Sequence, residues 1–186
     1  MTSLDELQLS RYDGSTARTV ASRLVDVYSD VYADRAGNPF FSVSRFAERL
    51  ENHLTAPGFA LVTGEINGDL VGYAYGASLR AGTMWWQGLS ERTPPDLLRE
   101  TGSRTFALNE IMVRAPWRRR GIAYRLHAEL LANRHESRAT LLVEQENQPA
   151  RAAYRKWGWR RLGHLQPFSD APVYESMLID LPLAPA

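Results

Sequence analysis

The chain has 186 residues and a formal net charge of +1 at pH 7, and charged side chains make up 23% of it. A chain of this length can bury a proper hydrophobic core, so we expect residues 1–186 to form a single domain. A net charge so close to zero argues against a broad nucleic-acid or membrane surface, and we expect neither kind of partner. The lack of cysteine excludes disulfide frameworks, thiolate zinc sites and cysteine nucleophiles.

The start of the sequence shows no targeting signal. Residues 1–15 carry acidic side chains and contain no apolar segment of the length of a signal peptide. No run of the sequence approaches the roughly 18 apolar residues that a membrane-spanning helix needs. We therefore expect a cytoplasmic protein.

A predicted strand over 7–12 opens the chain, and two predicted helices follow it. Ser15 or Thr16 can cap the first helix, and Ser42 or Ser44 can begin the second. Apolar and aromatic side chains at three- and four-residue steps give each helix one packed side, formed by Val20, Leu24, Val25, Tyr28, Phe46, Leu50 and His53.

A β-hairpin is predicted around Asn67 and Gly68, because both residues tolerate the positive φ of a tight type I′ turn. Its two strands are expected over 59–66 and 70–77. We expect these strands to pair antiparallel.

The segment 78–105 is rich in glycine and proline and is predicted to be a long excursion with one short helix near 96–99. It carries Trp85 and Trp86. These side chains either plug the core or contact a ligand, and both interpretations stay open because large aromatic residues serve both purposes.

The segment 106–131 changes from the period of a strand to the period of a helix. Over 106–113 apolar residues surround one carboxylate, Glu110, as in a central strand that is covered on both faces. Pro116 ends that strand. After Gly121 a helix is predicted, with an apolar stripe formed by Ile122, Ala123, Leu126, Leu130 and Leu131.

A basic turn joins this strand to this helix, and it contains Arg118, Arg119, Arg120 and Gly121. The first amides of a helix have no partner within it and attract anions, and a glycine lets a phosphate approach the backbone closely. The arginines raise the local positive potential, so the turn is a candidate anion site. The alternative is that these arginines are a solvated surface run.

Another strand is predicted over 139–143, and a helix follows it. Asn147 can cap this helix and Gly158 can end it in the left-handed conformation. The apolar steps of the helix place Tyr154 on its packed side. We expect the last two strands over 159–165 and 173–181.

Two patterns resemble the recurring blocks of the GCN5-related N-acetyltransferase (GNAT) superfamily. Arg118-x-x-Gly121-x-Ala123 is similar to the coenzyme A signature Q/R-x-x-G-x-G/A. The run Asn147-x-x-Ala150-x-x-x-Tyr154-x-x-x-Gly158-Trp159 is similar to N-x-x-A-x-x-x-Y-x-x-x-G-F, with tryptophan in place of the usual aromatic residue. The order of the two blocks also fits the family.

The resemblance implies an α+β fold of the GNAT type, a mixed, mostly antiparallel central sheet of about six or seven strands flanked by helices. Residues 1–57 would form the helical N-terminal part, and 58–182 the core with the coenzyme A site. The implied reaction moves an acetyl group from acetyl-coenzyme A to a primary amine by direct attack, without a covalent enzyme intermediate. We expect a small-molecule amine acceptor and a monomer or homodimer.

The resemblance also implies roles for single residues. In the family, the strand before the signature offers backbone groups to the pantetheine arm, and the loop amides bind the diphosphate of the coenzyme. The implied coenzyme-binding residues are Ile111, Met112, Val113, Arg118, Arg119, Arg120, Gly121, Ile122, Ala123, Tyr124, Asn147 and Tyr154. The family's tyrosine lies near the thioester sulfur, so Tyr154 is the implied catalytic acid, and a phenol keeps its proton at neutral pH. The structural alternatives are a helix cap for Asn147 and a core position for Tyr154.

Glu110 is our candidate for the base, directly or through a water molecule, since it is the one carboxylate within the predicted central strand. Alternation places it on the same side as Leu108 and Met112. The alternative is that it orients a neighbouring arginine. Together with Trp85 and Trp86 it would line the acceptor site, where aromatic side chains beside a carboxylate would suit a small cationic amine.

The histidines show no metal-binding spacing, so we expect no metal, and no Walker or dinucleotide-binding pattern is present. A rival acceptor is the amino terminus or a lysine of a peptide or protein. A rival of another class is an acyl-coenzyme A binding module that senses or assembles without catalysis.

Overall fold

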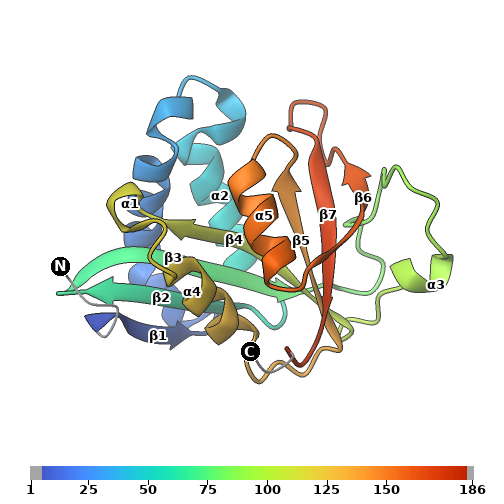
Figure 1. Ribbon diagram of the computed structural model, residues 1–186, viewed down its shortest axis with the longest axis horizontal. Helices are drawn as coiled ribbons and strands as arrows, with labels where there is room; N and C mark the ends of the chain where they lie inside the picture. The colour runs from blue at the N-terminus through green and yellow to red at the C-terminus, as the bar shows by residue number, and fades with distance from the viewer. Residues whose placement is uncertain (1–5, 184–186) are drawn as a thin grey trace. The chain divides into compact units, whose positions relative to one another are not determined.

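The structure is a computed structural model that describes residues 6–183. Residues 1–5 and 184–186 lie outside the described residues. Two predictions fall partly on them: the absence of a targeting signal over 1–15 and the two ends of the single domain 1–186. Within the described part, seven strands form one sheet in the order β1-β2-β3-β4-β5-β7-β6, and helices flank it (Figure 1). The pairs β1–β2, β2–β3, β5–β7 and β6–β7 are antiparallel, and β4 pairs parallel with β5. The predicted α+β class with a mostly antiparallel sheet is therefore confirmed.

The elements follow the chain in the predicted order. The strands are β1 (Gln8–Tyr12), β2 (Ala60–Ile66), β3 (Asp69–Ser78), β4 (Thr105–Val113), β5 (Arg138–Glu144), β6 (Arg160–Leu165) and β7 (Tyr174–Asp180). The helices are α1 (Ala21–Val31), α2 (Val43–Leu54), α3 (Pro95–Leu98), α4 (Ile122–Leu131) and α5 (Gln148–Lys156).

The chain divides into two compact units. Unit 1 holds the residues up to Ala77 together with Asn109–Leu130, and unit 2 holds Ser78–Leu108 and the residues from Leu131 onward. A single domain over 1–186 stays a prediction.

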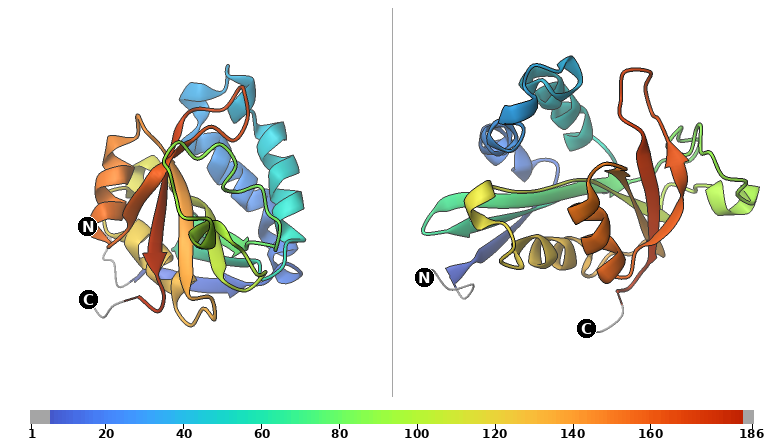
Figure 2. Two further views of the ribbon diagram at one scale, coloured as in Figure 1. Left: turned by 90° about the vertical axis from the view of Figure 1, so that its right-hand side faces the viewer. Right: turned by 45° about the horizontal axis from the view of Figure 1, so that its top comes forward.

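In unit 1, α1 and α2 cover one face of strands β1 to β3, and α4 lies on the other face (Figure 2). The core under α1 and α2 is aromatic: the rings of Tyr28 and Phe46 stack with centroids 4.0 Å apart. Leu24, Leu50 and Tyr73 are buried in the same cluster. Burying a side chain of this size contributes about 1.5–3 kcal/mol, so the amphipathic stripes read from the sequence are what hold the two helices to the sheet.

The start of the first helix differs from the prediction. A short 3₁₀ segment, Thr16–Val20, precedes α1, and Asp13 caps it in place of Ser15 or Thr16. The Asp13 carboxylate accepts the backbone N–H groups of Ser15 and Thr16 at 3.0 and 2.9 Å. These hydrogen bonds, that of the Thr16 amide first, lower the pKa of Asp13 to about 2. Ser15 cannot cap because its own backbone is already helical.

The other predicted turns are confirmed. Ser42 caps α2 by accepting the Arg45 amide at 3.4 Å. Asn67 and Gly68 have φ values of 53° and 83°, as the hairpin between β2 and β3 requires. Gly158 has a φ of 94° at the end of α5.

In unit 2, β7 pairs antiparallel with both β5 and β6, and α5 covers one face of these strands (Figure 1). The segment between β3 and β4 returns to strand β6, where the Ser90 amide donates to the His164 carbonyl at 2.8 Å. A Cβ on Gly163 would lie 2.8 Å from the Glu91 side chain, so this crossing needs a glycine. The excursion thereby covers part of β6, the strand at one edge of the sheet. Edge strands with exposed backbone groups favour aggregation, and such covering reduces that exposure.

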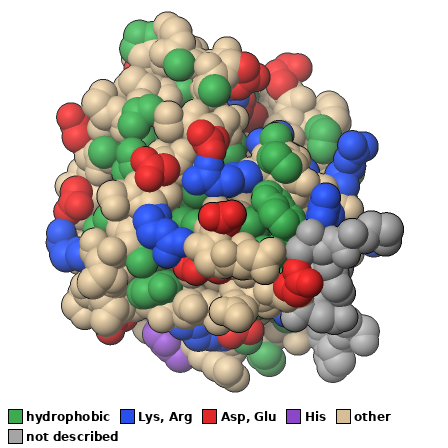
Figure 3. All heavy atoms as spheres, turned by 90° about the vertical axis from the view of Figure 1, so that its left-hand side faces the viewer, with side chains coloured by type: hydrophobic (Ala, Val, Ile, Leu, Met, Phe, Trp, Pro, Cys, Tyr) green, Lys and Arg blue, Asp and Glu red, His purple; other side chains and the backbone are tan. Residues whose placement is uncertain are grey.

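The charged side chains are mixed in sign on the face shown in Figure 3, where acidic, basic and apolar groups alternate. Among the described residues, every helix is too short or too polar to cross a bilayer.

Gly72 lets β3 approach the end of β4, because a Cβ at this position would lie 2.5 Å from the Met112 carbonyl oxygen. We expect Gly72→Ala to lower the free energy of unfolding by about 1–3 kcal/mol, since the added methyl forces the two backbones apart. Gly37→Ala is the matched control, because no atom lies within 4 Å of its Cβ position. Urea denaturation measures both, and equal stability of the two variants would contradict this account of the crossing.

Candidate active site

The turn between β4 and α4 lies in unit 1 and has a left-handed backbone at two positions. Arg119 has a φ of 61° and Gly121 a φ of 77°. Glycine reaches this region freely, whereas a residue with a side chain does so at a cost of about 1–2 kcal/mol. Neighbouring residues that alternate between right- and left-handed conformations turn successive N–H groups toward a common point, which favours an anion there. The turn therefore has the backbone of an anion site.

The helix that follows directs its first amides at the same turn. The first hydrogen bond of α4 runs from the Arg125 amide to the Gly121 carbonyl at 3.1 Å. The N–H groups of Ile122 and Ala123 precede it and have no carbonyl partner within the helix. These amides and the positive end of the helix dipole lie at the end of α4 that begins at the turn.

The arginines of the turn are exposed, but two of them have local contacts. Arg118 Nε donates to the Val113 carbonyl at 3.0 Å. The Arg120 guanidinium lies 5.0 Å from the centre of the Trp117 ring. Both predicted interpretations of this run remain compatible with such exposure, since a solvated arginine and an arginine ready to bind an anion both point to water.

In β4, before the turn, one side chain is buried in the core and another lies near a charged side chain. Met112 is buried, and its sulfur accepts the Tyr73 hydroxyl at 3.3 Å. Glu110, on the same side of the strand as predicted, lies 3.7 Å from Arg49 Nη2 of α2. Glu110 therefore has a neighbouring arginine, as expected if its role is to orient an arginine and not to act as a base. The base role itself stays a prediction.

Arg49 and His53 were missed as members of this site, although a four-residue spacing on α2 gave a signal. Burial lowers the pKa of Arg49, but Glu110 and Tyr28 outweigh burial, so that pKa lies above its ordinary value. His53 Nδ1 lies 3.2 Å from the Tyr75 hydroxyl. Burial, and then the charge of Arg49, lowers the pKa of His53 to about 4, so this imidazole is neutral at pH 7.

The second predicted block lies in unit 2, on α5. Asn147 caps the helix by accepting the Ala150 amide at 3.2 Å, so the structural alternative is realised for this residue. Tyr154 is buried, and its ring meets those of Trp157 and Trp159 edge to face at 5.5 and 6.0 Å. The aromatic residue at position 159 thus helps to fix the tyrosine ring. Neither contact tests a role of these side chains toward a ligand.

Trp86 packs in the core of unit 2, where it is buried with Leu79, Ala107 and Leu178. Its indole Nε1 donates to Glu100 Oε1 at 3.1 Å. Trp85 packs against the same cluster but is less buried, and its Nε1 has no hydrogen-bond partner among the described residues. Of the two tryptophans, Trp85 therefore better retains the predicted role in ligand contact.

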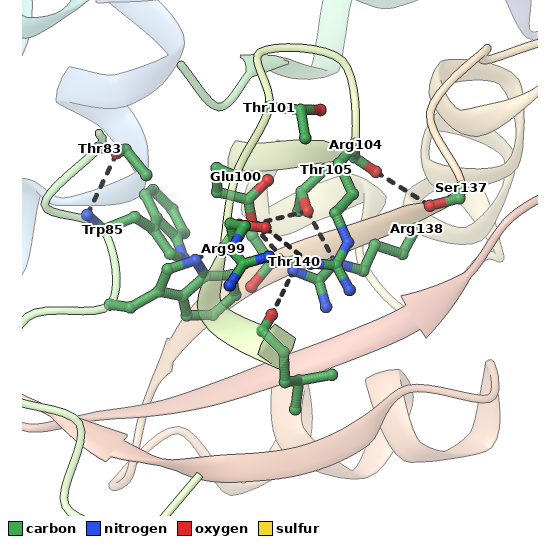
Figure 4. A network of polar contacts seen from close by, with 12 residues as sticks. Thr83, Trp85, Arg99, Glu100, Thr101, Arg104, Thr105, Ser137, Arg138 and Thr140 are labelled. Atoms are coloured by element: carbon green, nitrogen blue, oxygen red, sulfur yellow. Dashed lines mark hydrogen bonds and ion pairs between the residues drawn. The ribbon is translucent and has the colours of Figure 1, made fainter. Parts of the chain in front are cut away.

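A buried ion pair anchors the excursion that carries these tryptophans (Figure 4). Arg138 Nη2 of β5 donates to Glu100 Oε1 at 2.8 Å, and the two side chains are only 5% and 1% exposed. Thr105 bridges them, donating to Glu100 and accepting from Arg138 Nε at 2.8 and 2.7 Å. Arg138 also donates to the Leu97 carbonyl in α3 at 2.7 Å. Sequence reasoning missed this network.

Among the described residues, no cluster of three or more side chains could hold a metal ion.

Comparisons with known proteins bear on this arrangement. The model of the acetyltransferase (GNAT) family matches residues 23–159. No curated protein matches the chain in sequence.

Several solved structures are similar in fold. PH1933 from Pyrococcus horikoshii is 15% identical with a TM-score of 0.68, and the match covers 96% of this chain and 100% of that one. An aminoglycoside 6'-acetyltransferase type Ii is 17% identical with a TM-score of 0.65, over 96% and 99% of the two chains. A chimeric spermidine N-acetyltransferase from Vibrio cholerae and hSSAT is 15% identical with a TM-score of 0.60, over 94% and 95%. At such low identities the likeness shows the fold alone.

The ion pair of Arg138 with Glu100, which holds the excursion in place, can be tested by substituting one of the two partners. We expect Arg138→Met to lower the free energy of unfolding by about 3–5 kcal/mol, because it leaves the Glu100 carboxylate buried without its partner. Adding Glu100→Leu should restore much of that loss. Arg160→Ala is the control, since its ion pair with Asp180 is exposed and worth about 1 kcal/mol or less. Denaturant unfolding of the three variants and the unchanged protein measures this, and a double variant no more stable than Arg138→Met would contradict it.

Proposed function

The chain belongs to the GNAT family of acetyltransferases, and from that premise we propose that it transfers an acetyl group from acetyl-coenzyme A to a primary amine of a small molecule. The observation that carries the proposal is the turn from β4 to α4, where Arg119 and Gly121 are left-handed and the first intrahelical hydrogen bond starts only at the Arg125 amide. Such a turn fits the diphosphate of the coenzyme.

The proposed coenzyme-binding residues lie on β4, on the turn after it and at the starts of α4 and α5. The amides from Arg118 to Tyr124 would hold the diphosphate, and the backbone of β4 from Ile111 to Val113 would hold the pantetheine arm. The fit is supported by Arg118, whose Nε already bonds the Val113 carbonyl and leaves its other N–H groups for a phosphate oxygen. Asn147 would contact the coenzyme through its side-chain amide while its oxygen caps α5.

When bound, the coenzyme supplies an activated acetyl carbonyl. The amine nitrogen attacks that carbonyl carbon, the amide C–N bond forms and the thioester C–S bond breaks. The Tyr154 hydroxyl donates the proton that the departing sulfur needs. Glu110 takes a proton from the amine, directly or through water. Holding both reactants side by side provides much of the rate enhancement.

The acceptor is proposed to be small because the structurally similar proteins include acetyltransferases named for an aminoglycoside and for spermidine. Trp85 would line its site, with Trp86 as support behind it. A peptide or protein amine remains the rival acceptor, and a non-catalytic acyl-coenzyme A binding module the rival class. We also propose a cytoplasmic location, no metal, no nucleic-acid or membrane partner, and a monomer or homodimer.

Coenzyme binding is the first test. Isothermal calorimetry should detect acetyl-coenzyme A, and Arg118→Ala should weaken its binding about 10-fold, which corresponds to about 1.4 kcal/mol for one lost phosphate contact. Arg18→Ala is the control, because Arg18 pairs with Glu51 at an exposed position away from the turn. An unchanged dissociation constant in Arg118→Ala would count against the diphosphate site.

Turnover is the second test. Thiol release from acetyl-coenzyme A should require an added amine, and Tyr154→Phe should lower kcat about 100-fold or more while coenzyme affinity is kept, as for loss of a general acid. Tyr12→Phe, in β1, is the matched control. Coenzyme binding without thiol release on any amine would favour the binding module, and unchanged kcat in Tyr154→Phe would remove its role as acid.

A further inference from the structure

Glu175 of β7 is a buried carboxylate that binds arginines of α5. Its side chain is 1% exposed, and that of Arg151 is 18% exposed. Oε2 of Glu175 accepts hydrogen bonds from Arg151 Nη2 at 2.6 Å and from Arg151 Nε at 3.1 Å. Arg155 Nη2 donates to Glu175 Oε1 at 3.1 Å, but the Arg155 side chain is half exposed. Two charge-assisted hydrogen bonds fix both the position and the orientation of a guanidinium, so Arg151 is the main partner.

The third nitrogen of Arg151 binds the segment that carries Asn147. Arg151 Nη1 donates to the Gln145 carbonyl at 3.1 Å and to Gln148 Oε1 at 3.2 Å. These two residues come before and after Asn147 in the chain. The Gln145 amide donates in turn to the carbonyl of Val173, just before β7, at 3.2 Å. One guanidinium therefore connects β7, the link from β5 to α5 and the first turn of α5.

The backbone at Asn147 turns sharply. Its φ and ψ are −81° and 70°, and the Gln148 amide donates to the Glu146 carbonyl at 2.9 Å. These values describe an inverse γ-turn centred on Asn147, whereas most residues that cap a helix have an extended backbone. The turn lies between the two groups that Arg151 Nη1 binds, the Gln145 carbonyl and the Gln148 side chain. Arg151 thus holds both sides of the turn that sets the direction of the Asn147 side chain.

Arg151 also lies between the two candidate ligand residues of α5. Asn147 precedes it by four positions and Tyr154 follows it by three, so the three side chains neighbour one another along one side of the helix. The Tyr154 ring is held by edge-to-face contacts with Trp157 and Trp159. The hydrogen bonds from Arg151 Nη1 act instead on the Asn147 end of the helix.

We propose that Glu175 and Arg151 are positioning residues for coenzyme binding. Glu175 holds Arg151, and Arg151 holds the turn that presents the amide group of Asn147 to the coenzyme. Both act through this turn and not by touching the coenzyme. The inference rests on the proposed coenzyme site and adds two residues to it: Arg151 occupies an unspecified position of the second family block, and Glu175 lies outside both blocks.

Isothermal calorimetry with acetyl-coenzyme A tests the role of Arg151. We expect Arg151→Met to weaken binding about 10-fold, as for one misplaced polar contact. The kcat at saturating coenzyme should change by less than about 3-fold, because Tyr154 is held by its tryptophan neighbours and only binding is affected. Arg151→Lys keeps the charge but not the planar group with its several N–H donors. It should recover part of the affinity, and it serves if Arg151→Met does not fold.

Arg134→Met is the matched control for a loss of stability alone. It too removes an arginine from a buried carboxylate of unit 2, that of Glu136. Glu136 keeps a hydrogen bond from Ser78, as Glu175 keeps one from Arg155 in Arg151→Met. We expect Arg134→Met to bind the coenzyme like the unchanged protein, at a temperature at which circular dichroism shows both variants folded.

A double-mutant cycle tests whether Arg151 acts through Asn147. Asn147→Ser keeps an oxygen that can cap α5 and removes the amide group. If Arg151 acts through this group, the double variant should bind the coenzyme no more weakly than the weaker of the two single variants, because the effects of coupled residues are not additive.

Three results would overturn the inference while coenzyme binding by the unchanged protein stands. They are an unchanged dissociation constant in Arg151→Met or in Asn147→Ser, an equal loss of affinity in Arg134→Met, and additive losses in the double variant. No binding of acetyl-coenzyme A to the unchanged protein would overturn the proposed function as well.

Discussion

The backbone path from β4 into α4 is the constraint on which the candidate site depends. Two left-handed residues, Arg119 and Gly121, redirect the chain within three positions, and one of them carries a side chain. That conformation is unfavourable by about 1–2 kcal/mol for a residue other than glycine, so the surrounding structure must hold it. The contact of Arg118 with the Val113 carbonyl ties the turn to the end of the strand. This path sets where α4 begins, and with it the position of the first α4 amides.

The features that the sequence predicted correctly are those that a few neighbouring residues determine. The hairpin at Asn67 and Gly68 depends only on which residues tolerate a positive φ. Asp13 escaped prediction because several adjacent residues could cap, and only the observed backbone angles decide among them. The contact of Arg138 with Glu100 spans 38 residues, and no periodicity links positions so far apart. For the site, periodicity placed Tyr154 on a packed face, but its catalytic role came from family resemblance and stays a prediction.

Buried carboxylates in unit 2 share one arrangement, in which a neighbouring arginine offsets the free-energy cost of removing the carboxylate from water. Burial raises the pKa of Glu136, but hydrogen bonds from Arg134 and Ser78 outweigh burial, so the pKa lies below its ordinary value. Glu175 follows the same rule with arginines of α5. Such pairs contribute little net stability compared with apolar packing, but they penalise any arrangement that separates the partners. They therefore specify which segments meet, including the excursion that carries Trp85 and Trp86.

Against this pattern, the contact of Arg49 with Glu110 is an exception. In unit 2 the partners meet at hydrogen-bond distances, such as 2.8 Å for Arg138 and Glu100, whereas Arg49 and Glu110 stand 3.7 Å apart and one guanidinium nitrogen stays unsatisfied. The longer distance does not discharge the guanidinium. Glu110 and Tyr28 outweigh burial and hold the pKa of Arg49 above its ordinary value, so the positive charge beside the candidate base is kept.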